Sequence, residues 1–395
     1  MNFQERLQTE FGNNVTARAA TPQDAVDGVL PVAVAEPHDA DSALALVAWC
    51  GREDVAFVAR GGGTKIGIGA RPRRCDLVIS TARLNRIIEH DEGNATVAAE
   101  AGITLESLNR AVGERGQFVP LDGAEAGSAA TLGGVVASNH SGLTRLKYNM
   151  PRDLVVGLHA ALSDGRMIKA GSKVVKNVSG YDLNKIFIGS HGTLGLITQV
   201  TLRLRPHDAA SATWQSDCAT WEEAVQLATM ILDGPFEPTG LQVRANGSTL
   251  RFLARFDGGE TSVRTQIGRL PANPAVEEIA APPFTQMLRL QAVLPLQHAQ
   301  QWARQAQEFG AREVQWDCGT GVVGAAFEAV PDVAALRVAA ERVAGFVVVA
   351  SAPAELKMPE FVWGAPRSDF ALAQRLKDAY DAARVCAPGR FIGGI

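Results

Sequence analysis

Several features that would indicate particular functions are missing from this sequence of 395 residues. The five cysteines are scattered, odd in number and without Cys-x-x-Cys or other metal-binding spacing, so we expect a reducing compartment and no metal site. The formal net charge is only -4 and no block of Lys or Arg is present. This charge balance gives no reason to expect a nucleic-acid partner.

Targeting and membrane segments are also not expected. The chain begins Met1-Asn2-Phe3-Gln4-Glu5-Arg6, which has mixed charge and no apolar core, so no signal peptide is predicted. No uninterrupted apolar run approaches the ~18 residues that a spanning helix needs. With 46% hydrophobic and 20% charged residues the composition is that of an ordinary soluble protein. We therefore expect a cytoplasmic protein, with any membrane association made through partner subunits.

Glycine, in contrast, is concentrated in a few stretches. The apolar run from Val55 to Ala59 is typical of a short buried strand, and a glycine-rich loop follows it. Glycine tolerates positive φ, so such a loop can turn several backbone N–H groups toward one anion, usually a phosphate. The alternative is a merely flexible loop. The residues that we predict to take part are Arg60, Gly61, Gly62, Gly63, Thr64, Lys65 and Gly69.

This loop does not fit the two common nucleotide motifs. Ile66 stands where the dinucleotide fingerprint requires its third glycine, and the Gly-Lys-Ser/Thr of a triphosphate-binding loop is absent at the required spacing. If the loop binds phosphate, it must belong to another nucleotide-binding architecture.

Further segments rich in small residues follow between residues 130 and 198. Small side chains let the backbone approach a flat or extended ligand closely, although close packing of helices and strands would also select them. Lys176 and Asn177 could supply a positive charge and hydrogen bonds to an electron-rich ring. The candidate residues in these segments are Thr131, Gly133, Gly134, Ser138, Asn139, Gly142, Lys176, Asn177, Tyr181, Gly195 and Ile197.

The periodicity of apolar residues predicts a mixed α and β chain of two or three domains. A βαβ-like start is expected from 32–79, with Asp41 or Ser42 as the N-cap of its helix, and a two-residue hairpin turn at Asp164-Gly165. After Pro206 glycines become sparse and strands alternate with helices. The expected helices are 3–11, 39–51, 104–115, 221–232, 261–270, 297–309, 332–344 and 369–384, and the expected strands are 32–34, 55–59, 77–79, 87–101 (a pair), 154–162, 167–169, 197–204, 250–256, 288–293, 313–316, 322–327 and 346–350.

The order of these motifs resembles the vanillyl-alcohol-oxidase-type (PCMH-type) FAD-binding family, most of all its glycolate and D-lactate dehydrogenase branch. The resemblance is strong over about residues 30–205. Over 206–395 it rests on layout and on Ala387-Pro388-Gly389-Arg390, which is similar to an Asn-Pro-Gly-Arg ending. Length and layout most resemble the short FAD-binding component, designated E, of bacterial glycolate oxidases.

The resemblance implies an α+β fold with a two-lobed FAD-binding domain over 1–205 (subdomains of about 1–80 and 81–205). A small α+β cap domain with an antiparallel sheet is expected over 206–350, and 351–395 is expected to return to the FAD domain. Non-covalent FAD is the implied cofactor. Its pyrophosphate would lie on the loop at 61–64 and its adenine half near Gly195 and Ile197. Its ring would lie near the segment that contains Lys176, Asn177 and Tyr181.

Three departures from the family pattern stand out. Asn149 replaces a glycine, and asparagine is the next-best residue for a left-handed turn. His140 and His191 occupy places of a small and an acidic residue; either could lie near the flavin, or each could be satisfied by neighbouring backbone. The third departure is that only His207 and His298 follow residue 206, so the histidine-rich motif with which catalytic relatives bind a metal and take the hydroxyl proton is missing.

The implied function is that of an FAD-binding subunit in a glycolate oxidase complex, with a small 2-hydroxy acid as substrate. Hydride transfer from C2 to flavin N5 would be followed by electron transfer to an iron–sulfur subunit and a membrane acceptor, beside a second FAD subunit. The catalytic residues remain unidentified. The alternatives are a free-standing FAD-dependent oxidase of another alcohol or sugar, a non-catalytic FAD subunit of the complex, and a structural subunit with a vestigial site.

Overall fold

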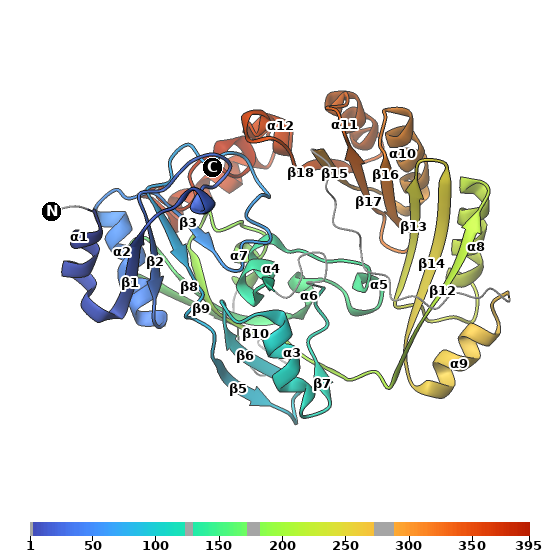
Figure 1. Ribbon diagram of the computed structural model, residues 1–395, viewed down its shortest axis with the longest axis horizontal. Coiled ribbons are helices and arrows are strands. Elements are labelled where there is room, and N and C mark those ends of the chain that lie inside the picture. The colour runs from blue at the N-terminus through green and yellow to red at the C-terminus, as the bar shows by residue number, and fades with distance from the viewer. Residues whose placement is uncertain (1–2, 123–128, 172–181, 272–287) are drawn as a thin grey trace. The chain divides into compact units, whose positions relative to one another are not determined.

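A computed structural model describes residues 3–122, 129–171, 182–271 and 288–395 of the chain. The chain divides into two compact units (Figure 1). Unit 1 comprises Met1–His140, Met150–Pro206 and Ala354–Ile395, and unit 2 comprises Ser141–Asn149 and His207–Pro353. The contribution of Ser141–Asn149 to unit 2 was not expected from the sequence, which places one domain boundary near residue 206 and another near 350.

Unit 1 begins with helix α1 (Phe3–Phe11) and a four-stranded sheet in the order β1-β2-β4-β3. Strands β2, β4 and β3 run parallel, as the predicted βαβ start requires, and β1 is added antiparallel at the edge. Strand β1 was not predicted, because its polar residues between the helix and Pro31 read as a linker. The bounds are β1 Val15–Ala19, β2 Ala33–Pro37, α2 Ala40–Arg52, β3 Phe57–Arg60 and β4 Leu77–Ser80.

The N-cap of α2 is Asp39, so the expectation of Asp41 or Ser42 is wrong. The carboxylate of Asp39 accepts a hydrogen bond from the backbone N–H of Ser42 at 2.8 Å. The hydroxyl of Ser42 in turn accepts one from the backbone N–H of Asp39 at 3.0 Å. This reciprocal capping satisfies two N–H groups at the start of the helix, which is why the helix begins at Ala40, directly after Asp39.

The second sheet of unit 1 has five antiparallel strands in the order β5-β6-β10-β8-β9, and helices α3 and α4 pack on its core. The paired strands, the helix from Thr104 and the strand near 197–204 are confirmed. The bounds are β5 Ile87–Asp91, β6 Thr96–Glu100, α3 Leu105–Gly113, β7 Gln117–Phe118, α4 Leu132–Ser138, α6 Pro151–Leu154, β8 Val155–Ala161, β9 Met167–Gly171, α7 Asn184–Phe187, β10 Leu196–Arg203 and β11 Arg205–Pro206.

The hairpin between β8 and β9 has a three-residue loop, one residue longer than predicted. The N–H of Gly165 bonds to the carbonyl of Leu162, and Gly165 has a φ of 86°. A type I turn followed by a left-handed glycine joins two strands with the twist that a sheet requires. The Asp164-Gly165 signal therefore located the turn correctly and missed only its length.

Unit 2 is a seven-stranded antiparallel sheet in the order β12-β14-β13-β16-β17-β15-β18 with four longer helices packed against it (Figure 1). This sheet confirms the expected antiparallel α+β character. The bounds are α5 Arg145–Tyr148, β12 Ala210–Cys218, α8 Trp221–Leu232, β13 Gly240–Asn246, β14 Thr249–Gly258, α9 Glu260–Gly268, β15 Leu288–Val293, α10 Leu296–Glu308, β16 Glu313–Asp317, β17 Val322–Phe327, α11 Val333–Glu341 and β18 Phe346–Ser351.

Strands β12 and β13 were not predicted. Strand β12 is mostly polar, with Trp214 and Cys218 as its buried residues, because it lies at the edge of the sheet. Strand β13 alternates polar residues with the buried Leu241, Val243 and Ala245, and its polar members obscured this pattern.

The C-terminal segment carries α12 (Pro359–Trp363), which was not predicted, and α13 (Phe370–Tyr380), and it belongs to unit 1. After α13 the chain runs beside β3. The N–H of Phe57 bonds to the carbonyl of Val385 at 2.8 Å, and the N–H of Ala387 bonds to the carbonyl of Phe57 at 2.7 Å. The C-terminal segment therefore packs beside β3, the strand that leads into the glycine loop.

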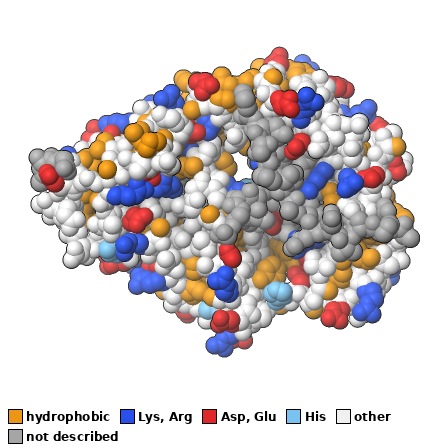
Figure 2. Space-filling view, in the orientation of Figure 1, with side chains coloured by type: hydrophobic (Ala, Val, Ile, Leu, Met, Phe, Trp, Pro, Cys, Tyr) orange, Lys and Arg blue, Asp and Glu red, His pale blue; other side chains and the backbone are white. Residues whose placement is uncertain are grey.

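The cysteines, the helices and the surface charges can be compared with the sequence. All five cysteines are buried and unbonded to one another, and burial raises the pKa of Cys75 to about 11. In the described part of the chain, no helix combines the length and the apolar character needed to cross a membrane. On the face drawn in Figure 2, basic and acidic side chains are interspersed.

Candidate functional site

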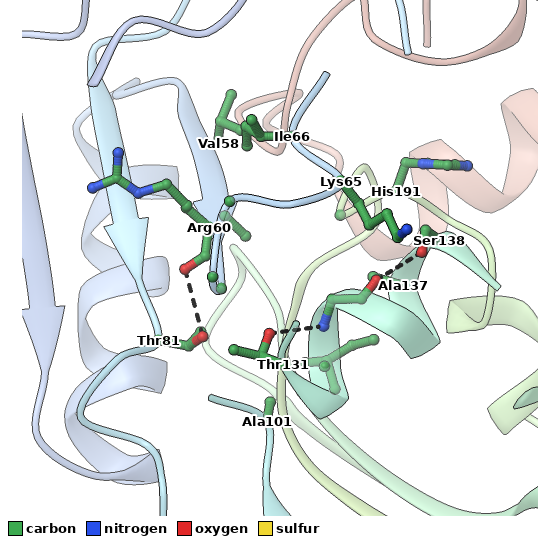
Figure 3. A pocket seen from close by; sticks show the side chains of 18 of the residues that line it. Val58, Arg60, Lys65, Ile66, Thr81, Ala101, Thr131, Ala137, Ser138 and His191 are labelled. Carbon is green, nitrogen blue, oxygen red and sulfur yellow. Dashed lines mark hydrogen bonds between the residues drawn. The ribbon is translucent and has the colours of Figure 1, made fainter. Parts of the chain in front are cut away.

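One pocket in unit 1 collects three of the glycine-rich segments that the sequence singled out (Figure 3). The loop after β3, helix α4 and the loop before β10 form its walls, and it encloses about 780 Å³ including space open to solvent. Its lining residues are Val58, Ala59, Arg60, Gly61, Gly62, Gly63, Thr64, Lys65, Ile66, Ile68, Thr81, Ala101, Thr131, Gly133, Gly134, Ala137, Ser138, His191, Gly192, Gly195, Leu196, Ile197 and Arg390.

Most of the predicted cofactor-binding residues therefore lie together. Gly69, Asn139 and Gly142 are not among the lining residues, and Lys176, Asn177 and Tyr181 lie outside the described residues. Their roles, like those of the residues in the pocket, remain predictions. The predicted residues that line the pocket are Arg60, Gly61, Gly62, Gly63, Thr64, Lys65, Thr131, Gly133, Gly134, Ser138, Gly195 and Ile197.

The glycine loop is packed so closely that side chains are excluded at two positions. A Cβ on Gly62 would lie 1.6 Å from the carbonyl oxygen of Ala129, and a Cβ on Gly61 would lie 2.0 Å from Oγ1 of Thr131. Such distances cannot be relieved by rotating a side chain when the partner is backbone. The loop therefore presents main chain to the pocket, as a phosphate cradle requires.

Helix α4 forms the facing wall and is held by polar contacts of its own. Oγ1 of Thr131 accepts the N–H of Gly134 at 3.3 Å, which makes Thr131 the N-cap, and the hydroxyl of Ser138 donates to the carbonyl of Gly134 at 2.8 Å (Figure 3). Gly133 packs against the end of β6, where its Cβ would lie 2.6 Å from Cβ of Ala101. The small residues of α4 thus let the helix pack closely on the sheet, and Ala101, Gly133 and Gly134 at this contact line the pocket.

The side chain of Arg60 is committed elsewhere. Its guanidinium pairs with Asp24 at 2.9 Å, and Figure 3 shows it pointing away from Thr131 and Ser138. Asp24 is almost fully buried, and hydrogen bonds from Arg18, Thr21 and Arg60 hold the pKa of its carboxyl far below its usual range. Arg60 therefore anchors the end of β3, and only its backbone is oriented for the pocket, where its carbonyl accepts the N–H of Thr81 at 2.9 Å. Lys65, in contrast, extends toward Ser138 in Figure 3.

His191 lines the pocket. The sequence left open whether it lies near the flavin or is satisfied by neighbouring backbone. Its backbone adopts a φ of 53° and its N–H bonds to the carbonyl of Ala137 at 2.9 Å. Its ring lies 5.2 Å from that of Trp363 and 5.7 Å from that of Phe391. Burial, with the charge of Arg390 in second place, lowers its pKa to about 4, so the imidazole is neutral at neutral pH.

The other described residues that the sequence singled out lie outside the pocket lining, and most of them contact neighbouring backbone. His140 is not among the lining residues, and its N–H bonds to the carbonyl of Val135 at 3.1 Å. Asn139 ends α4 with a φ of 48°, and its side-chain oxygen accepts the N–H of Arg152 at 3.2 Å. Gly69 has a φ of 111° and packs on the backbone of Arg390. Gly142 belongs to unit 2.

Arg390 is a charged residue of the site that sequence reasoning missed. It was recognised only as part of the terminal motif, yet it lines the pocket and is 3% exposed. Its guanidinium donates to the carbonyl of Ile68 at 2.8 Å and to that of Ile66, and it pairs with Asp27 at 2.9 Å. Its position directly after Pro388-Gly389, within the family-like ending, is the feature of the sequence that could have suggested a role in the site.

These features fit a bound dinucleotide. A glycine loop that packs through its main chain against residues 129–131 can approach a diphosphate through backbone, and apolar Val58, Ile66, Leu196 and Ile197 can cover uncharged parts of such a ligand. The described residues contain no group of three or more His, Cys, Asp or Glu that could hold a metal ion.

Comparison with known proteins defines the class. The family described as FAD binding domain matches residues 31–171, which include the glycine loop and α4. A solved structure of alkyldihydroxyacetonephosphate synthase superposes with a TM-score of 0.69 over 98% of this chain and 85% of that one, at 16% identity, which shows a shared fold. Residues 31–171 are thus a PCMH-type FAD-binding domain, and the cofactor is FAD.

Curated relatives are similar over part of their length. Glycolate oxidase subunit GlcD of Bacillus subtilis is 34% identical over 231 residues, which are 58% of this chain and 48% of that protein. D-lactate dehydrogenase of Archaeoglobus fulgidus is 38% identical over 174 residues, 44% of this chain and 38% of that protein. D-2-hydroxyglutarate dehydrogenase of Xanthomonas citri is 36% identical over 174 residues, 44% and 37% respectively. The chain thus spans at most about half of each of these relatives.

Proposed function

We propose that this protein is an FAD-dependent oxidoreductase that acts on a 2-hydroxy acid. The observation that supports this most is the meeting of three separate glycine-rich segments in one pocket within the unit that carries the FAD binding domain. The relatives named above, which are named for glycolate, D-lactate and D-2-hydroxyglutarate, share a 2-hydroxy acid as the chemical class. FAD supplies a two-electron acceptor for the hydrogen on the hydroxyl-bearing carbon.

The residues of the pocket would divide the work of holding that cofactor. The backbone of Gly61–Thr64 would carry the diphosphate, and the glycines of α4 would let the cofactor approach the main chain. Gly195 and Ile197 would lie against the adenine half. Lys65 is a cation of the loop and extends into the region between the loop and α4 (Figure 3). No residue of the described chain is assigned to proton removal from the substrate.

The finer proposal is that the chain works as the FAD-binding subunit of a glycolate oxidase complex. Support comes from what unit 2 contains. From residue 206 onward the sequence has only two histidines. An arginine could bind a substrate carboxylate, but two arginines of this unit are paired within it: Arg251 with Asp217 at 2.7 Å and Arg255 with Asp257 at 2.9 Å. A chain with these residues would pass electrons through its flavin to an iron–sulfur partner, while a second FAD subunit would oxidise the substrate.

A visible spectrum tests both levels of the proposal. We expect the purified chain to be yellow, with the flavin band unchanged by glycolate or D-lactate under anaerobic conditions. In the presence of the partner subunits the same substrates should bleach the band, with L-lactate as the control of opposite configuration. A colourless protein that takes up no FAD would overturn the assignment as a flavoprotein.

Bleaching of the isolated chain would uphold the oxidoreductase and reject the need for a partner. In that case a free-standing oxidase becomes the better description, and activity with dye acceptors and a set of alcohols and sugars would identify its substrate. Failure of every 2-hydroxy acid to bleach the complete complex would leave a flavoprotein without substrate chemistry, which contradicts the proposal at its first level.

A further inference from the structure

A buried cluster of three charged residues lies behind the glycine loop. It consists of Asp27, Lys357 and Arg390, and we call it the loop cluster. Lys357 and Arg390 are each 3% exposed, and the side chain of Asp27 is 10% exposed. Nζ of Lys357 bonds to the carboxylate of Asp27 and to the carbonyl of Gly67. Arg390 bonds to the other oxygen of Asp27 and to the carbonyls of Ile66 and Ile68.

The charges of the loop cluster do not balance. Two cations face one carboxylate, and among the residues that the structure describes no other acidic group forms an ion pair with either cation. The remaining acceptors are neutral carbonyls, so one net positive charge stays in the interior. A buried charge without a counter-charge is costly, and natural proteins keep one mainly where a ligand or partner supplies the opposite charge.

The unbalanced charge is felt on the pocket side. Arg390 itself lines the pocket, and its charge adds to the effect of burial in lowering the pKa of His191 in the loop before β10. Burial lowers the pKa of Lys357, and Arg390 lowers it further, while Asp27 opposes both effects. Arg390 is therefore the member of the cluster that lies at the pocket, where its charge acts on a neighbouring lining residue.

The cluster also orients the loop. Its cations bind three successive carbonyls, those of Ile66, Gly67 and Ile68. In a trans peptide the N–H of the next residue points away from the carbonyl, so the N–H groups of residues 67–69 are directed away from the cations. That of Ile68 bonds to the carbonyl of Lys65 at 3.0 Å, which closes a turn in the loop. By binding the carbonyls, the cluster fixes the direction in which the backbone N–H groups of residues 67–69 point.

We propose that the loop cluster is the electrostatic support of the diphosphate site, with Arg390 and Lys357 as positioning residues for an anionic ligand. The inference rests on the proposed function, since FAD is the ligand whose diphosphate would supply the missing negative charge. It adds that affinity for the diphosphate depends on the net charge of the cluster, not only on the glycine backbone. Asp27, Lys357 and Arg390 all lie outside the glycine-rich motifs in the sequence, although they contact the glycine loop in the fold.

A series of three variants changes the net charge of the cluster in both directions. Lys357→Met makes it neutral and should raise the Kd for FAD about tenfold, because one unit charge near a diphosphate is worth about that much at the effective dielectric of a protein. Asp27→Asn makes it doubly positive and should leave binding as tight as in the wild type or tighter. The double variant restores one positive charge and should bind within about threefold of the wild type. Apo protein is titrated with FAD by fluorescence.

A purely structural role predicts another order. If the cluster only holds the loop in place, Asp27→Asn removes an acceptor from both cations and must weaken binding, and the double variant must be weakest. That order, or an unchanged Kd in Lys357→Met, would overturn the proposal. Lys169→Met removes a charge from an exposed position of β9 and is the matched control, with no change in Kd expected. Thermal unfolding of each apo variant reports its fold.

Inorganic pyrophosphate separates this proposal from the function on which it rests. Calorimetric titration of the same four proteins with pyrophosphate should give the same order of affinities, since the probe carries the charge without the flavin. If the wild type takes up no FAD, the assignment as a flavoprotein fails, and the pyrophosphate order still decides the role of the cluster. If the wild type holds FAD but neither ligand follows the charge order, the cluster proposal alone fails.

Discussion

At the scale of single residues, Gly62 is the most sensitive point of the pocket. Gly62→Ala places a methyl group 1.6 Å from the carbonyl oxygen of Ala129, so the loop has to move. We expect the purified variant to lose most of its FAD, measured as the ratio of flavin to protein absorbance. Gly113→Ala is the control, because a Cβ there meets nothing within 4 Å. A normal flavin content in Gly62→Ala would refute the cradle.

His191 links the pocket to pH. Its pKa is about 4 in the folded protein against 6.5 for an ordinary histidine, so between these values the unfolded chain binds a proton that the native state does not. Acidification through this range therefore favours unfolding, and above pH ~6.5 the residue contributes nothing.

The variant His191→Asn tests this, since asparagine tolerates the left-handed backbone that His191 adopts. From pH 7 to pH 4.5 the variant should lose about 2 kcal/mol less stability than the wild type in denaturant titrations. The difference between the two proteins should be constant above pH 7, which serves as the internal control. Parallel curves down to pH 4.5 would show that His191 titrates normally.

At the scale of elements, helix α13 fastens the loop before β10. Lys377 and Asp381 form a fully buried ion pair at 2.7 Å. Nζ of Lys377 donates to the carbonyls of Thr193 and Cys386, and Asp381 accepts from the hydroxyl of Ser163 and the N–H of Cys386. The pair therefore ties one pocket wall to the C-terminal segment, as the loop cluster ties the other.

Removal of one partner should be severe. Lys377→Met leaves the carboxylate of Asp381 buried without its cation, and we expect a loss of about 3–5 kcal/mol in the free energy of unfolding. Asp378→Asn, also on α13, breaks the exposed pair with Arg384 beyond the end of the helix and should cost less than about 1 kcal/mol. Urea unfolding of both variants gives the comparison. Equal losses would mean that the buried pair is dispensable.

Periodicity and turn residues sufficed for most elements, because buried strands and amphipathic helices carry local patterns. They failed where a strand is mostly polar, as in β12, and where a cap depends on a reciprocal contact, as in Asp39. The glycine motifs located three pocket walls in advance. Arg390 could not be placed, since its contact with Ile66 joins residues 324 positions apart and no local pattern encodes such a distance.

At the scale of the molecule, FAD should stabilise one unit more than the other. The whole described pocket is built from residues of unit 1, so binding energy acts on the folding of that unit. Calorimetric unfolding with excess FAD should raise the transition of unit 1 by several degrees and move the other transition little. Gly62→Ala, which disrupts the cradle, should abolish the shift. An equal rise of both transitions would indicate that FAD stabilises the two units together.

The position of Arg390 in the chain has a consequence for synthesis. A ribosome that adds roughly 5–20 residues each second needs on the order of half a minute to pass from Ile66 to Arg390. During that time the glycine loop exists without the cations that hold its carbonyls. By the proposal above, the nascent protein gains its full affinity for the cofactor only after segment 354–395 has folded against the loop.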